Sequence, residues 1–161
     1  MILRSIRSGD ASSIAAIYNH YIVATAATFE ETRLSPEEMR QRIAETTNAF
    51  PWLVCEEDGV VQGYCYAHKW RERAAYRHSA EVSVYLGPGA VGRGLGSALL
   101  EALIAELRGR GFHCAIGGVS LPNDASVALL EKHGFVKVAH FREVGFKLGR
   151  WIDVGYWQLA L

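Results

Sequence analysis

Hydrophobic positions follow helical spacing in some segments and alternate with polar positions in others, and no segment repeats. The first segment, Ile2–Arg7, has the pattern of a short strand. Asp10 is placed to cap a helix that begins after it. The apolar residues of this helix recur at helical intervals: Ile14, Ile17, Tyr18, Tyr21 and Ile22. A helix with one apolar stripe is expected to pack against a core.

The next elements have clear local start and turn signals. Ser35 stands before a proline and Glu38 follows three residues later, which is a capping box and predicts a helix over Pro36–Thr46. The segments Trp52–Glu56 and Val60–His68 have the pattern of strands. An Asp-Gly pair between them supplies the positive φ values of a tight turn. The two strands are therefore expected to form an antiparallel hairpin.

A strand, a glycine-rich loop and a helix follow in that order. In the strand Ala80–Leu86 aliphatic residues alternate with others, and Glu81 lies on the polar face. Five glycines fall within Gly87–Gly96, and a leucine-rich helix follows that Gly111 can end. The remaining elements are a strand, a helix and two strands: Cys114–Val119, Asp124–His133, Phe135–Phe141 and Gly155–Leu161. This order predicts one mixed α/β domain over residues 1–161.

Composition and charge exclude several classes of protein. Half of the 161 residues are hydrophobic, and 17 basic side chains balance 17 acidic ones. A neutral chain lacks the field that favours nucleic-acid binding, and its apolar runs are too short to span a membrane. No secretion signal is evident, so we expect a cytoplasmic protein. Cys55, Cys65 and Cys114 are isolated, which predicts buried thiols and neither a disulfide framework nor a metal site.

The glycine-rich loop is the main candidate for ligand binding. Where a strand leads through such a loop into a helix, backbone N–H groups gather at the positive end of the helix dipole and stabilise anionic oxygens. The segment is Val91–Ser97, in which Arg93 adds a charge suited to phosphate. It lacks the lysine of a Walker loop, and its GxGxG spacing differs from a Rossmann fingerprint. It predicts a diphosphate site; the alternative is a surface loop whose glycines only form turns.

Seven segments carry a family resemblance. They are NHYI, PWLV, WRERAAY, SAEVSVYL, GRGLGSALL, LPNDASV and GFKLGRWIDVGYWQL, which begin at residues 19, 51, 70, 79, 92, 121 and 145. Together they resemble the GCN5-related N-acetyltransferase (GNAT) superfamily and, within it, the phosphinothricin N-acetyltransferase group. The resemblance implies an α/β (α+β) fold with a central mixed, mostly antiparallel sheet, flanking helices and two strands that open in a V.

The resemblance also implies a reaction, in which acetyl-CoA donates an acetyl group to the amine of a small glutamate-like amino acid such as phosphinothricin, methionine sulfoximine or methionine sulfone. The ammonium must lose a proton before its nitrogen attacks the thioester. Glu81 is the candidate base if a partly dry cleft raises its pKa; the alternative is a solvent-facing position on an ordinary strand. Val84 is the candidate oxyanion donor, through a backbone N–H exposed where two strands diverge.

The implied coenzyme contacts lie on the strand, the glycine loop and a later helix. They are Val84, Tyr85, Leu86, Val91, Gly92, Arg93, Gly94, Leu95, Gly96, Ser97, Asn123, Ser126 and Lys132. Asn123 would also cap its helix. The superfamily's Gln or Arg at the head of the loop is Val91 here, so some coenzyme affinity is expected to be lost. The alternative for Val84–Leu86 is core packing, and for Lys132 a solvated helix surface.

The implied acceptor contacts come from three separate parts of the chain. They are Phe29, Arg71, Arg73, Tyr76, Glu81 and Trp151. Guanidinium groups suit an acceptor that bears a carboxylate and a second oxyanion, because their donors bind oxygen atoms in pairs. The alternative for Arg71 and Arg73 is a hydrated loop, and for Phe29 a place in the core.

One departure from the family concerns the thiolate leaving group. Relatives carry His or Tyr five positions before Phe135 as its proton donor, and this chain has Leu130, which cannot donate. His133 lies near the same face but is better explained as a histidine favoured at a helix end. Water or Tyr85 would then protonate the thiolate. Leu130→His is expected to raise kcat if this step limits the rate.

Two other functions stay open. The acceptor could be a protein N-terminus or another amine, in which case an open groove would replace a closed pocket lined by Arg71 and Arg73. The chain could also sense acyl-CoA without turnover. No cysteine has an adjacent base, so direct transfer in a ternary complex is expected. Because the relatives are homodimers, Tyr156 and Trp157 are candidates for a dimer interface, although core burial explains them equally.

Overall fold

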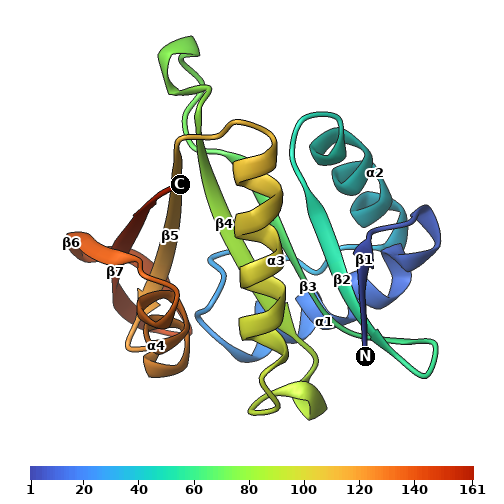
Figure 1. Cartoon of the computed structure of the whole chain (residues 1–161). Helices are drawn as coiled ribbons and strands as arrows, with labels where there is room; N and C mark the ends of the chain where they lie inside the picture. The colour runs from blue at the N-terminus through green and yellow to red at the C-terminus, as the bar shows by residue number, and fades with distance from the viewer.

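The computed structural model covers residues Met1–Leu161 and contains one sheet with helices on both faces (Figure 1). The strands are β1 Ile2–Ser5, β2 Trp52–Glu57, β3 Val60–Lys69, β4 Ser79–Leu86, β5 Cys114–Leu121, β6 Val136–Lys147 and β7 Arg150–Ala160. The helices are α1 Ala11–Ala24, α2 Pro36–Thr47, α3 Leu95–Gly109 and α4 Asp124–Lys132. The sheet order is β1-β2-β3-β4-β5-β7-β6, and only β4 and β5 pair in parallel. The predicted mixed, mostly antiparallel fold is confirmed.

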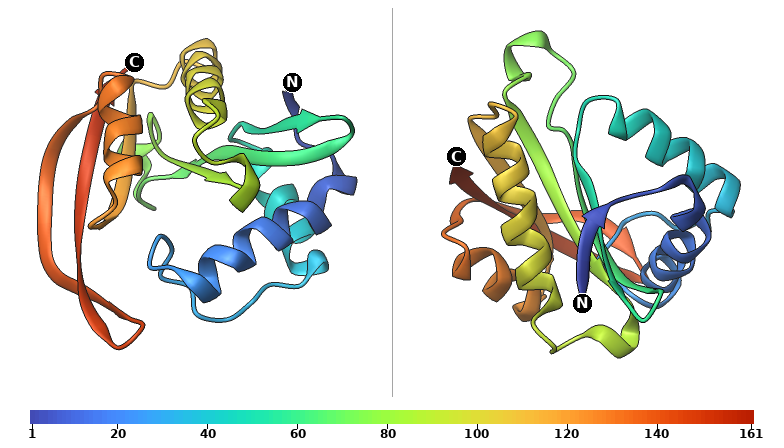
Figure 2. Two further views of the ribbon diagram at one scale, coloured as in Figure 1. Left: turned by 90° about the horizontal axis from the view of Figure 1, so that it is seen from below. Right: turned by 45° about the vertical axis from the view of Figure 1, so that its right-hand side comes forward.

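Each face of the sheet has its own hydrophobic core. α3 and α4 cover one face and α1 and α2 the other, as the view from below shows (Figure 2). Strand β4 contributes to both cores, because Val82 packs on the α3 side and Tyr85 packs on the α1 side. The face of β4 that carries Glu81 is therefore partly covered rather than simply polar.

Strands β4 and β5 pair along only a short stretch. Their register runs from Ser79 opposite Cys114 to Glu81 opposite Ile116, and no pairing follows. Strand β3 stays paired with β4 up to Leu86. The second half of β4 thus has a free edge, which is the V-shaped opening that the family resemblance implies.

The C-terminal hairpin β6–β7 is longer than the sequence pattern predicts. The final strands were expected over Phe135–Phe141 and Gly155–Leu161, but β6 continues to Lys147 and β7 begins at Arg150. A register shift between Phe141 and Gly145 accommodates Glu143 at a positive φ of 48°. This bulge interrupts the alternation of side chains, so the pattern hides the second part of β6.

The predicted caps of the first two helices have different outcomes. The capping box of α2 is confirmed, since Ser35 Oγ accepts from Glu38 N and the Glu38 carboxylate accepts from Ser35 N. The prediction for Asp10 is wrong, because its carboxylate accepts from the Arg4 guanidinium at 2.8 and 2.9 Å and from Arg7 N at 2.7 Å. A charged, bidentate partner competes successfully with a helix N–H.

None of the four helices is both long and apolar enough to cross a membrane. Cys55, Cys65 and Cys114 are free thiols and are buried, as the sequence predicted.

Candidate active site

Glu81 lies where β4 stops pairing with β5. It stands opposite His68 on β3, and its Oε2 is 3.9 Å from His68 Nε2. The Glu81 side chain is 25% exposed. Burial raises the pKa of this carboxyl, and the positive charges of His68 and Arg71 oppose that rise. A carboxyl with a raised pKa next to an opening in the sheet has the properties of a general base.

Two groups on neighbouring strands define the space beside Glu81. A Cβ on Gly118 of β5 would lie 3.1 Å from Glu81 Oε1 and 3.0 Å from the ring of Tyr156. Only glycine therefore leaves the carboxylate and the Tyr156 ring their present positions. Burial raises the pKa of the Tyr156 hydroxyl, and the charge of Glu81 raises it further.

The backbone of Val84 faces the opening. In an antiparallel pair, alternate residues direct their N–H and C=O groups toward and away from the partner strand. Gly87 N donates to Gln62 O at 2.8 Å, and this register makes Val84 one of the residues whose groups point away from β3. Leu86 follows the same rule, since its carbonyl accepts from the Tyr21 hydroxyl at 2.7 Å. The Val84 N–H thus points into the gap between β4 and β5.

The glycine-rich loop leads directly into α3. Gly92 and Gly94 both have φ of +80°, a conformation that L residues rarely adopt. Gly94 is the N-cap residue of α3, so no side chain caps the first N–H groups of the helix. A Cβ on Gly96 would be 3.6 Å from Leu86 and 3.9 Å from Val84, so the loop adjoins the free edge of β4. Uncapped N–H groups beside an open strand edge fit a diphosphate with an extended arm.

Polar partners already hold two residues of this loop. Arg93 Nη2 is 2.5 Å from Glu57 Oε2 at the end of β2, so the guanidinium is ion-paired. Ser97 Oγ lies 2.8 Å from His133 Nε2 at the end of α4. His133 is thereby engaged with α3.

Helix α4 carries the remaining predicted coenzyme residues. Asn123 caps it as predicted, with Oδ1 accepting from Ser126 N at 3.1 Å. Lys132 is exposed at the other end of the helix. Leu130 belongs to the core and packs so closely that a Cβ on Gly117 would lie 2.8 Å from it. Its side chain fills space between α4 and β5 and is no proton donor.

The structure separates the predicted arginines. The Arg71 guanidinium stacks over the Trp70 ring at 4.3 Å from the centroid and is close enough to affect Glu81. Arg73 and Tyr76 belong to the segment that projects beyond the sheet between β3 and β4, and both are exposed (Figure 1). The structure thus brings Arg71, but not the other two, to Glu81 within one chain.

Phe29 and Trp151 both contact the C-terminal hairpin. Phe29 lies on the backbone of β6, where a Cβ on Gly145 would be 2.3 Å from its ring. Trp151 packs against Phe146 with ring centroids 4.9 Å apart and is 62% exposed. Neither side chain lines the pocket described next.

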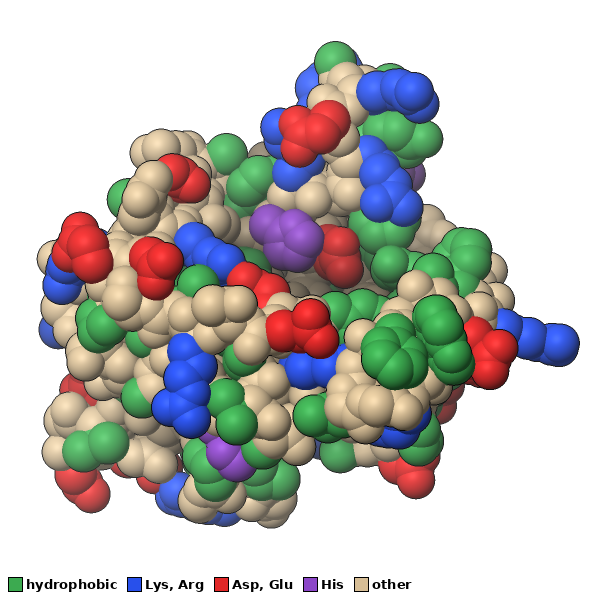
Figure 3. Space-filling model, turned by 180° about the vertical axis from the view of Figure 1, so that it is seen from behind, with side chains coloured by type: hydrophobic (Ala, Val, Ile, Leu, Met, Phe, Trp, Pro, Cys, Tyr) green, Lys and Arg blue, Asp and Glu red, His purple; other side chains and the backbone are tan.

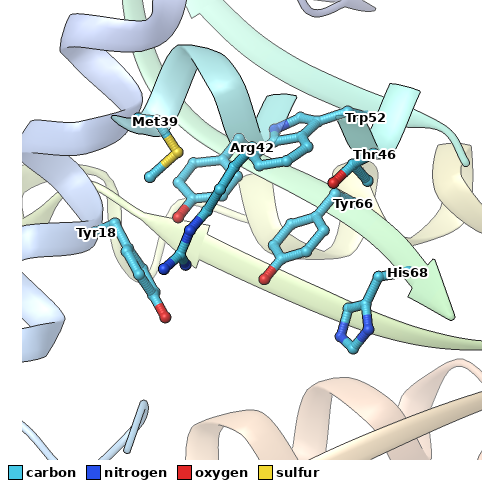
Figure 4. Close-up of a pocket in the computed structure, with 8 residues that line it drawn as sticks. Tyr18, Met39, Arg42, Thr46, Trp52, Tyr66 and His68 are labelled. Carbon is cyan, nitrogen blue, oxygen red and sulfur yellow. The ribbon is translucent and has the colours of Figure 1, made fainter. Parts of the chain in front are cut away.

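A pocket of about 240 Å³ lies on the α1–α2 side of β2 and β3. Its lining residues are Tyr18, Met39, Arg42, Thr46, Trp52, Tyr64, Tyr66 and His68 (Figure 4). Arg42 is ion-paired with Glu30 at 2.5 Å, and Tyr18 also bonds to Glu30. His68 belongs to this pocket and also faces Glu81, so the pocket adjoins Glu81. Charged side chains surround the hollow on this side of the molecule (Figure 3).

Sequence reasoning missed this pocket and His68. Alternation along β3 does place Tyr64, Tyr66 and His68 on one face. The sequence pattern therefore predicts that these three side chains share a face. It does not predict which helix covers this face or which strand lies beside it, because both depend on tertiary packing.

Comparison with known proteins agrees with this arrangement. Residues 3–155 match the acetyltransferase (GNAT) domain family. The chain is 41% identical over 165 residues to the L-amino acid N-acyltransferase MnaT of Escherichia coli, covering 100% of this chain and 94% of the relative. It is 42% identical over 161 residues to a phosphinothricin N-acetyltransferase of Alcaligenes faecalis, covering 99% and 82%.

A solved structure of a GNAT superfamily phosphinothricin acetyltransferase from Sinorhizobium meliloti, in complex with acetyl-CoA, superposes with a TM-score of 0.96 and 38% identity. The alignment covers 99% of this chain and 88% of that one. The chain belongs to the GNAT acetyltransferase family, which confirms the resemblance that the sequence segments indicated.

Proposed function

We propose that residues 1–161 form one acetyltransferase domain that transfers the acetyl group of acetyl-CoA to the amine of a small amino acid of the phosphinothricin or methionine sulfoximine type. The observation that carries the proposal is the position of Glu81. It lies at the end of the β4–β5 pairing, between the free edge of β4 and a pocket. The relatives' names support a small amino acid as the acceptor.

Coenzyme binding would use the glycine loop and the free edge of β4. The uncapped N–H groups at the start of α3 suit the diphosphate, and Gly92 and Gly94 keep side chains away from it. The pantetheine arm would pair with the backbone of Val84–Leu86 and reach Asn123 and Ser126. Arg93 has to leave Glu57 before it can contact a phosphate.

The chemistry needs one base and one oxyanion donor. Glu81 would take a proton from the acceptor ammonium, either directly or through water. The Val84 N–H would donate to the oxygen that becomes negative when the amine attacks the thioester carbonyl. Tyr85 is the other candidate donor to the thiolate, but burial raises the pKa of its hydroxyl well above its ordinary value, so it gives up a proton less readily. Because Leu130 is buried and apolar, water would protonate the departing thiolate.

The acceptor's anionic groups would meet Arg71 first, because this arginine lies near Glu81. Arg73 and Tyr76 in the projecting segment, together with Phe29 and Trp151, complete the set that the family pattern implies. These four side chains are all exposed in the single chain. A closed acceptor site therefore requires further groups around them.

A homodimer would supply such groups. Large apolar side chains are exposed along the C-terminal hairpin: Val136, Val138, Phe141, Val144, Phe146, Leu148 and Trp151. Exposed apolar surface on this scale marks an interaction site. We infer that this hairpin forms the interface of a cytoplasmic homodimer.

Thiol release from acetyl-CoA tests the proposal. The panel is phosphinothricin, methionine sulfoximine, methionine sulfone, polyamines and short peptides, with wild type and Glu81→Gln measured side by side. Turnover with the small acids that disappears in Glu81→Gln supports the proposal. Turnover with peptides alone would assign a protein N-terminus as the acceptor, and binding of acetyl-CoA without any turnover would indicate a sensor.

A further inference from the structure

We infer that His68 is the proton acceptor for Glu81, so that the two side chains act as one proton-transfer pair. The inference rests on the proposed acetyltransferase function and adds a residue to its proton path. It follows from the position of His68 across the β3–β4 ladder, the orientation of its ring and the exposure of its side chain to solvent.

The ring orientation is fixed by a backbone contact. His68 Nδ1 lies 3.1 Å from the Lys69 carbonyl oxygen, which can only accept a hydrogen bond. Nδ1 is therefore the protonated nitrogen of the neutral ring, and Nε2 carries the lone pair. That lone pair is on the side of Glu81, with Nε2 3.9 Å from Oε2. A small rotation of the carboxyl group or one bridging water closes this distance.

The other groups around the pair keep a constant charge. Burial raises the pKa of the Tyr66 and Tyr156 hydroxyls, so both stay neutral over the working range. Arg42 is paired with Glu30 on the far side of the pocket. The remaining charge is that of Arg71, which is permanent. Imidazole is the side-chain type best suited to exchange protons in neutral solution, and His68 is the imidazole that faces Glu81.

His68 also has a route to solvent. Its side chain is 39% exposed, whereas that of Glu81 is 25% exposed. His68 stands at one end of the pocket beyond Tyr66, as the labelled side chains show (Figure 4). A proton that reaches the imidazole can therefore leave to bulk water without passing the acceptor.

The proton balance of the reaction gives this pair a defined task. The acceptor ammonium loses two protons while the N–C bond forms and the C–S bond of the thioester breaks. One proton ends on the thiolate through water, and the other is released. Glu81 takes the first proton and passes it to His68 Nε2, and the imidazolium releases it to solvent. Glu81 is then a carboxylate again for the next turnover.

The kinetic test compares His68→Asn and His68→Gln with His20→Gln. Asn keeps an amide donor near the Lys69 carbonyl, and His20 is an exposed histidine on α1 with no polar partner. The expected result for both His68 variants is a kcat at least tenfold lower, with KM for the acceptor within twofold. The acid limb of kcat/KM moves to higher pH, because the variants have no imidazolium in acidic solution to lower the pKa of Glu81. Added imidazole buffer restores part of the rate.

A second readout needs no acceptor. The tautomer of the His68 ring is determined by ¹⁵N NMR in wild type, and the proton of the neutral ring is expected on Nδ1, as the contact with the Lys69 carbonyl requires. A proton on Nε2 would overturn the pair whatever the acceptor is. So would a His68 variant with normal kcat and pH profile, or one whose lower rate shows no shift and no rescue by imidazole. If wild type acetylates none of the panel, only the proposed function fails.

Discussion

The two halves of the sheet are built differently. Strands β1–β4 lie between helices on both faces, and half of the residues of β2 and β3 are buried. In the second half, β5 packs against α4 and is largely buried, whereas β6 and β7 extend beyond this helix as a curved arm (Figure 2). Strand β6 is exposed along nearly its whole length. The first half buries most of its apolar residues within the chain, whereas the second half leaves many of its own apolar residues exposed to solvent.

Within the sheet, only three residue pairs join the halves, from Ser79–Cys114 to Glu81–Ile116. Glu81 lies at the last of them. The first half carries the glycine loop, the pocket and His68, while the second carries Gly118 and Tyr156 beside Glu81. In the proposed function the first half binds the ligands, the arm forms the subunit contacts, and the chemistry takes place at their junction.

The largest expected effect is at the junction itself. Glu81→Gln should lower kcat by roughly 10²- to 10⁴-fold, because the amide cannot accept the ammonium proton. Steady-state rates of thiol release measure this. The fold should be unchanged, since no hydrogen bond of the Glu81 side chain is broken, and circular dichroism provides the control. A variant with more than one tenth of wild-type kcat would remove Glu81 as the base.

The arm is tested by a matched pair of substitutions. Val144 on β6 and Val60 at the start of β3 are equally exposed, at 59% and 58%. Val144→Asp should weaken self-association at least 100-fold, because it buries a charge in the inferred interface. Val60→Asp should leave it unchanged. Sedimentation velocity over a concentration series distinguishes them, and equal behaviour of the two variants would contradict the proposed interface.

The first half is tested through its own ion pairs. Asp10→Asn should lower the free energy of unfolding by about 2 kcal/mol, because charged hydrogen bonds from Arg4 are lost. The pKa of Asp10 is lowered by these bonds, so their stabilisation is present above the ordinary aspartate pKa and disappears as pH falls through the lowered value.

Urea titrations between about pH 2 and 7 should therefore show the wild type and Asp10→Asn converging at low pH. Asp58→Asn is the matched control. Asp58 has a φ of 50° in the β2–β3 turn, which asparagine tolerates. The free energy of unfolding of Asp58→Asn should follow the wild-type pH curve. A constant difference in the free energy of unfolding between wild type and Asp10→Asn across this pH range would contradict the argument from the lowered pKa.

The smallest expected effect concerns the glycine loop. Gly94→Ala should raise KM for acetyl-CoA roughly tenfold, because an L residue at a φ of +80° costs about 1–2 kcal/mol and distorts the start of α3. Gly89→Ala is the control, since a Cβ there meets nothing within 4 Å and its φ is ordinary. Equal KM values for both variants would place the diphosphate elsewhere.

Local signals in the sequence were sufficient for much of the first half. Ser35 and Glu38 define the start of α2, and Asp58 with Gly59 defines the β2–β3 turn. The capping role of Asn123 follows in the same way. In each case the contacts that determine the local structure join residues only a few positions apart. The local sequence pattern is therefore enough to predict it.

Contacts between distant residues could not be predicted from local pattern. Asp10 bonds to Arg4, which is determined by the path of β1 rather than by helix chemistry. The segment between β3 and β4 does not define a register, so His68 could not be placed opposite Glu81. Trp151 is exposed because nothing within the chain covers β7 there. These features depend on tertiary or quaternary packing.

The contact of Phe29 with Gly145 couples two distant segments mechanically. The ring presses on bare backbone, and nearby Lys147 Nζ donates to the Thr28 carbonyl at 2.7 Å. The stretch between α1 and α2 is therefore tethered to the C-terminal arm and follows any bending of that arm. A methyl group at residue 145 would displace the Phe29 ring and so break this contact between the two segments.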